Sequence, residues 1–121
     1  MMYEQYPLLT ELYARGSAAF EGMPLASLLI EVRGGQLFIT GTTPLRDDGE
    51  HYIETGAEYC YILESAEAEK LLAALSRRSK DRPEKVIAEE FEFSRPDCRL
   101  KDYLDEEGIA CRYEWSPGEP I

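Results

Sequence analysis

The pair Gly34–Gly35 constrains the fold more than any other feature of the sequence. Both positions tolerate the positive φ that a two-residue β-hairpin turn requires. The segment Ser27–Arg33 before the pair is rich in strand-forming residues, and Gln36–Thr43 after it alternates Leu37 and Ile39 with polar neighbours. The pattern therefore predicts an antiparallel hairpin.

A third, long strand is predicted over His51–Leu63, where two sets of side chains alternate. One set is mostly apolar and comprises Ile53, Ala57, Tyr59, Tyr61 and Leu63, whereas the other comprises Tyr52, Glu54 and Glu58. Because alternate residues of a strand point to opposite faces, we expect the first set to face the core and the second to face solvent. Gly56 predicts a bulge or bend within this strand rather than a break into two elements.

Helical spacing of apolar residues appears on both sides of these strands. We expect a first helix over Pro7–Phe20, although Gly16 weakens that prediction. A second is expected over Ser65–Arg78 with Ser65 as N-cap. A third is expected over Asp97–Glu107, with Gly108 as the left-handed residue that ends it. Residues 85–93 fit a short helix or a strand equally well.

The closing segment Ile109–Trp115 predicts a strand that stops before Pro117. Its alternation would place Ile109, Cys111, Tyr113 and Trp115 toward the core. The expected fold class is α+β: an antiparallel sheet, made of a three-strand meander plus a C-terminal strand, packed against two or three helices.

Size and charge limit the classes of function. The 121 residues match one small domain, spanning 1–121, and the formal net charge is −11. Such a charge argues against nucleic acid or an anionic membrane as a partner. No apolar run approaches the roughly 20 residues that cross a bilayer, and no secretory signal is recognisable. With three cysteines and no CxxC pair, the sequence favours a cytoplasmic location with reduced thiols.

The charge is unevenly distributed along the chain. Residues 44–75 hold eight acids and two bases, whereas residues 76–85 hold five bases and two acids. Such a basic segment could form an anion site, but Arg77 and Arg78 fall at the expected end of a helix. Cations there complement the helix dipole without any ligand, which is the interpretation we favour.

Catalytic and metal-binding patterns find little support in the sequence. His51 is the only histidine, and Cys60, Cys98 and Cys111 lack a local nucleophile signature. The loop Asp47–Glu50 lacks the ligand spacing of an EF-hand, and common nucleotide-binding and hydrolase motifs are absent. We therefore expect no enzyme activity, no metal and no cofactor.

Acidic residues interleaved with tyrosine form the candidate binding site. Carboxylates steer a cationic partner, and tyrosine gives a large contact area at low entropic cost. The predicted site consists of Asp47, Asp48, Glu50, Tyr52, Glu54 and Glu58.

These features favour a monomeric or homodimeric protein-binding domain. The most concrete hypothesis is an immunity or antitoxin-like inhibitor that occludes a basic, nuclease-type toxin, because a nuclease must present a positive cleft to phosphates. The alternatives are a small enzyme or ligand-binding domain with a pocket between sheet and helices, or an assembly subunit.

Overall fold

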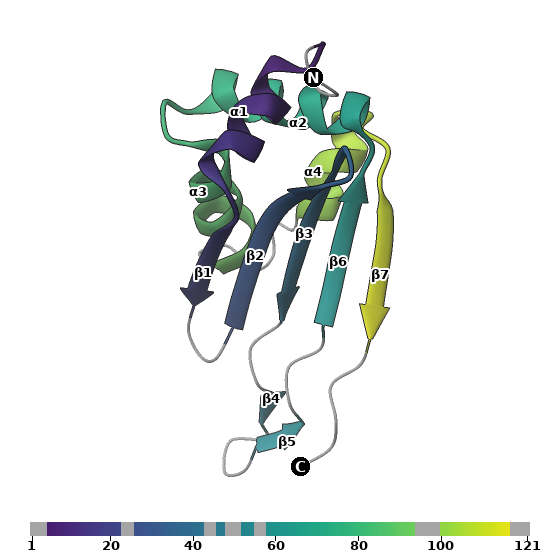
Figure 1. Cartoon of the computed structure of the whole chain (residues 1–121). Coiled ribbons are helices and arrows are strands. Elements are labelled where there is room, and N and C mark those ends of the chain that lie inside the picture. Colours follow the sequence, from purple (N-terminus) through teal and green to yellow (C-terminus); the bar gives the residue numbers. More distant parts are fainter. Residues whose placement is uncertain are drawn as a thin grey trace.

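An antiparallel five-stranded sheet with helices on one face forms the protein (Figure 1). The computed structural model describes residues 5–22, 26–42, 46–47, 52–54, 58–93 and 100–116. In chain order, the elements are α1 (Pro7–Arg15), β1 (Ala18–Gly22), β2 (Ala26–Arg33), β3 (Gln36–Thr42), β4 (Arg46–Asp47), β5 (Tyr52–Glu54), β6 (Glu58–Leu63), α2 (Ser65–Arg78), α3 (Pro83–Val86), the π-helix η1 (Ile87–Phe93), α4 (Leu100–Glu106) and β7 (Arg112–Ser116). The strand order β1-β2-β3-β6-β7 confirms the expected α+β class.

The predicted hairpin is present and joins β2 to β3. Gly34 and Gly35 have φ values of 56° and 81°, as a turn with two left-handed residues requires. The turn is also tied to the start of α2. Ser65 is the first residue of that helix, not its N-cap, and its hydroxyl donates a hydrogen bond to the carbonyl of Gly35. The neighbouring residues form a second contact, in which Gln36 Nε2 donates a hydrogen bond to Glu64 Oε1 over 2.6 Å.

The first helix is shorter than predicted, and a strand takes its last part. Helix α1 ends at Arg15, and β1 pairs with β2 through Ala18↔Ile30 and the following residues. Gly16 explains the break, because its φ of 84° and ψ of −178° lie in a region that only glycine adopts readily. The prediction of one helix over Pro7–Phe20 is therefore wrong.

The long strand predicted over His51–Leu63 is also divided. Residues 52–54 form β5, which pairs with β4 in a separate two-stranded sheet, and β6 starts only at Glu58. The prediction of one continuous strand is therefore wrong, because its first part pairs with β4 instead of β3. Gly56, where we predicted a bulge or bend, lies outside the described residues. The predicted inward face of the second part is correct, since Tyr59, Tyr61 and Leu63 are all buried.

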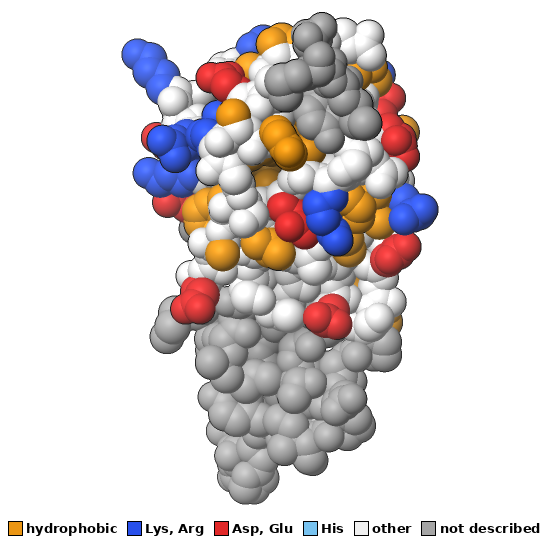
Figure 2. All heavy atoms as spheres, in the orientation of Figure 1, with side chains coloured by type: hydrophobic (Ala, Val, Ile, Leu, Met, Phe, Trp, Pro, Cys, Tyr) orange, Lys and Arg blue, Asp and Glu red, His pale blue; other side chains and the backbone are white. Residues whose placement is uncertain are grey.

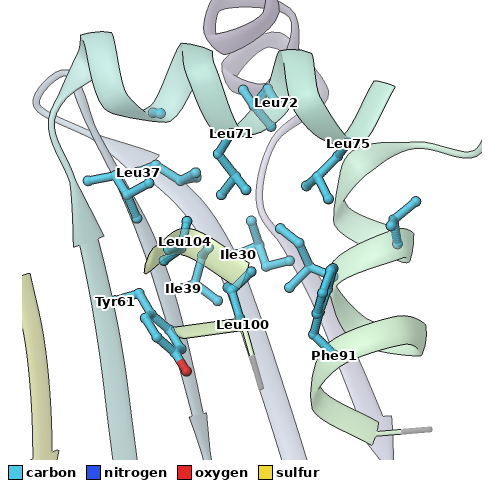
Figure 3. Packing of buried hydrophobic residues seen from close by; sticks show 14 of the residues in the cluster. Ile30, Leu37, Ile39, Tyr61, Leu71, Leu72, Leu75, Phe91, Leu100 and Leu104 are labelled. Carbon is cyan, nitrogen blue, oxygen red and sulfur yellow. The ribbon is translucent and has the colours of Figure 1, made fainter. Parts of the chain in front are cut away.

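The core lies between the sheet and the helices, as Figure 3 shows. Leu71 and Leu75 of α2 point toward apolar residues of the sheet, and Leu72 belongs to the same core cluster. Residues 85–93, which the sequence left open, are helical and belong to α3 and η1. Val86, Ile87, Ala88 and Phe91 are all buried, a spacing that no strand would bury on one face.

The exposure of Trp115 on the C-terminal strand β7 differs from the prediction. Tyr113 pairs with Tyr61 and Trp115 with Tyr59, so both residues lie on the helix side of the sheet as expected. Tyr113 is half-buried, but Trp115 is 57% exposed. Because β7 is an edge strand, Trp115 has a neighbouring strand on one side only, and the prediction that it is a core residue is wrong.

Two carboxylates of α2 accept hydrogen bonds from backbone N–H groups of other segments. Glu69 accepts hydrogen bonds from the N–H groups of Leu8 at 3.1 Å and Leu9 at 2.9 Å, which caps the N-terminus of α1. Glu67 accepts the N–H of Ala110 at 3.1 Å, just after the Gly108 turn that ends α4. These contacts join segments that are distant in sequence.

The Glu67 contact should make stability depend on pH. The hydrogen bond from Ala110, together with Lys70 at 3.2 Å, lowers the pKa of Glu67 below its ordinary value of 4.5. A carboxyl with a lowered pKa in the folded state stabilises the fold above its unfolded-state pKa and loses that contribution as the pH falls through the folded value. We expect the Tm of Glu67→Gln to fall less than that of the wild type between pH 6 and pH 3, measured by circular dichroism. Parallel Tm curves would contradict this role.

Candidate protein-binding surface

The six predicted site residues lie in the connection between β3 and β6 and at its end. Asp47 belongs to β4, Tyr52 and Glu54 belong to β5, and Glu58 begins β6. Asp48 and Glu50 lie outside the described residues. The register pairs Asp47 with Tyr52, so an acid and a tyrosine occupy directly opposite positions of this small hairpin.

Glu58 is separated from the other acids of the predicted site by the change of sheet. We expected Tyr52, Glu54 and Glu58 on one strand face, but β5 and β6 belong to different sheets. Figure 1 shows the β4–β5 hairpin beyond the ends of β3 and β6. The expected single face is therefore wrong, although Glu58 is exposed at the same end of the main sheet.

The face of the main sheet opposite the helices is the surface seen in Figure 2. Apolar, basic and acidic side chains are mixed on its upper part, and acidic side chains appear on its lower part. The arginines there are already engaged: Arg33 Nε lies 3.0 Å from Glu31, and Arg112 Nε lies 3.3 Å from Glu114. Arg33 also stacks over the Phe38 ring, 4.2 Å from its centroid.

A shallow groove of about 300 Å³ crosses the lower part of the sheet. Its lining residues come from β1, β2, β3 and β6: Ala19, Phe20, Glu21, Ser27, Leu28, Leu29, Thr40, Gly41, Thr42 and Glu58. Leu29 is unusual for a leucine, because 36% of it is exposed. The groove therefore combines an apolar floor with the carboxylates of Glu21 and Glu58. Glu58 is also one of the six residues of the predicted site.

Glu21 is the residue of this surface that the sequence analysis missed. It lies on β1, whose first three residues belong to the helix predicted over Pro7–Phe20, so its strand face could not be predicted. The alternation of Ala18, Phe20 and Gly22 with Ala19 and Glu21 is the signal that favours a strand there.

The two cysteines that the structure describes, Cys60 and Cys111, show no arrangement for nucleophilic catalysis. Cys60 is half-buried on the open face, where its Sγ lies 3.4 Å from the Thr40 hydroxyl. Burial raises the pKa of the Cys111 thiol, with a further contribution from Asp105, which disfavours the reactive thiolate. Cys98 and His51 lie outside the described residues.

Two cations of the basic segment 76–85 pair with acids of the same domain, Arg78 with Glu90 and Lys85 with Asp81. Arg77 and Arg78 lie in the last turn of α2, as expected. Arg78 Nε is 2.7 Å from Glu90, and its guanidinium lies over the rings of Phe91 and Tyr103. A cleft of about 380 Å³ lies next to it, lined by Leu8, Glu11, Arg15, Ser76, Ser79, Lys80, Asp81, Arg82 and Pro83. Its acids and bases are mixed, so it does not select a ligand charge.

Two features are absent from the described parts of the chain. No helix within them has the length and apolar character needed to cross a bilayer. No group of three or more His, Cys, Asp or Glu side chains within them could hold a metal ion. Comparisons with models of protein families, with curated proteins and with solved structures find no match to the chain.

Proposed function

We propose that the protein is a cytoplasmic protein-binding domain that occludes a basic partner, in the manner of an immunity or antitoxin-like inhibitor of a nuclease-type toxin. The binding surface is the acidic end of the sheet, which comprises the β4–β5 hairpin, its connecting residues 48–51, and the groove beside Glu58. One observation carries the proposal: in a chain of net charge −11, no helix of the described residues covers one face of the main sheet, and the groove on that face has two acids, Glu21 and Glu58, in its lining.

Electrostatics supplies the physical reason. A nuclease presents a positive cleft to phosphates, and an acidic domain can occupy or border that cleft. Complementary charges raise the rate of encounter, whereas buried aromatic contacts slow dissociation. In this proposal the acids of residues 47–58 steer the partner, and Tyr52 makes a buried contact.

Affinity purification from the native host tests the class of partner. We expect a basic protein whose nuclease activity the purified domain inhibits at equal molar amounts. Recovery of only acidic or neutral proteins, or of a basic protein whose activity is unchanged, would contradict the proposal.

A charge-neutralised variant tests the surface. Asp47→Asn, Asp48→Asn and Glu50→Gln together should slow association with the purified partner at least about tenfold at low salt and flatten its salt dependence, with an unchanged Tm. The matched control neutralises three exposed acids near α4, Asp102, Glu106 and Glu107. Stopped-flow fluorescence measures the rates, and equal slowing by both triple variants would show that only the net charge matters.

A further inference from the structure

The groove on the open face has an acid at each end. The sheet register places Glu21 opposite Ser27, Ser27 opposite Thr42, and Thr42 opposite Glu58. The two glutamates are therefore separated by three strand spacings, or about 14 Å. Two cationic side chains match this backbone spacing better than one.

The chemistry between the two acids is apolar and hydroxylic. Leu29 is the exposed apolar residue on the floor, beside the small side chain of Ala19. The hydroxyls of Ser27 and Thr42 are 3.0 Å apart and bond each other, so they offer a polar surface without a charge. No lysine or arginine is among the described residues that line the groove.

The charge pattern of this groove differs from that of the rest of the open face. Glu31 and Glu114 each lie beside an arginine of their own strand, within 3.3 Å. Within the described part of the chain, Glu21 and Glu58 make no such ion pair. A cationic occupant would therefore gain two carboxylates without displacing any arginine side chain that the structure describes.

From this geometry we infer that the groove binds an extended segment of the basic partner, with two arginine or lysine side chains about four residues apart. The segment crosses β1, β2, β3 and β6. One cation pairs with Glu21 and the other with Glu58, and an apolar side chain between them covers Leu29. This inference rests on the proposed function and specifies the partner's contact at the same end of the sheet.

A peptide probe tests the groove without the natural partner. The probe is an acetylated and amidated peptide, Ala-Arg-Thr-Val-Thr-Arg-Ala, whose arginines are spaced as required. Titration into the ¹⁵N-labelled protein at low salt should shift the amides of Leu29, Thr40 and Thr42 in a saturable manner. Glu21→Gln and Glu58→Gln should each weaken binding about threefold to fivefold, as expected for exposed ion pairs.

Two controls separate site binding from general attraction. Glu114→Gln removes one negative charge from the same face outside the groove and should leave the affinity within about 1.5-fold. A peptide of the same composition with adjacent arginines should bind more weakly. Equal weakening by all three variants, equal affinity of both peptides, or no saturable shift in the groove would each overturn the inference. Inhibition of a basic partner that survives Glu21→Gln and Glu58→Gln would overturn the inference while leaving the proposed function intact.

Discussion

Replacing Arg15 with methionine is expected to lower the free energy of unfolding by about 3 kcal/mol. Arg15 ends α1 and makes two hydrogen bonds to Glu84 of α3, with Nε–Oε2 at 3.0 Å and Nη2–Oε1 at 2.7 Å. Glu84 is only 4% exposed, whereas the Arg15 side chain is 25% exposed. The variant would leave a buried carboxylate without its cation, so the cost of desolvating that charge would no longer be offset. Urea denaturation at neutral pH measures the change.

Two variants decide whether the buried pair causes this loss. Adding Glu84→Gln to Arg15→Met should restore part of the stability, because a buried amide costs less than a buried charge. Arg33→Met breaks the exposed pair with Glu31 and should cost less than about 1 kcal/mol. Equal losses for Arg15→Met and Arg33→Met would contradict the role assigned to burial.

Turns and helix ends whose conformation is set by residues adjacent in the sequence could be predicted from the sequence. Gly34 and Gly35 supply the backbone conformation of their turn themselves. The helix Ser65–Arg78 also has its predicted end, although Ser65 is its first residue and not its N-cap. The end of α4 is equally local. Gly108 has a φ of 67°, and the Ile109 N–H bonds the Leu104 carbonyl at 2.9 Å, which is the hydrogen bond of a Schellman motif.

Elements that depend on distant residues were not predictable in this way. β1 forms because its backbone pairs with β2, and the cap of α1 comes from Glu69, about sixty positions along the chain. The register of β7 was correct, but the exposure of Trp115 depends on what lies beside an edge strand. Periodicity reports which face a residue occupies and does not report whether another element covers it.

The candidate surface likewise has a part that local sequence predicts and a part that depends on distant residues. Its acidic residues, including Glu58, were recognisable from the local density of charge between residues 44 and 75. The association of Glu58 with Glu21 depends on the register of four strands, and no short segment of sequence encodes that register. Assigning the first strand was therefore the step needed to find the groove.

Replacing Gly41 with alanine should lower the free energy of unfolding by about 2 kcal/mol, the range for overpacking a core. Gly41 pairs directly with Tyr59, whose ring covers the glycine. An added Cβ would lie 2.5 Å from Cζ and Oη of Tyr59 and 2.9 Å from the Ser27 carbonyl oxygen. The ring cannot easily move away, because Tyr59 is buried and packs edge-on against Tyr61 at 5.7 Å.

A double variant tests whether the Tyr59 ring causes that strain. Tyr59→Leu alone should destabilise the fold, but Gly41→Ala should cost less in a Tyr59→Leu background than in the wild type, because the shorter side chain leaves room for the methyl group. The part of the strain that comes from the Ser27 carbonyl should remain. Thr40→Ala, on the opposite face of the same strand, is the control and should cost less than about 1 kcal/mol. If Gly41→Ala costs the same in both backgrounds, the backbone of β2 and not the aromatic ring opposes a side chain at position 41.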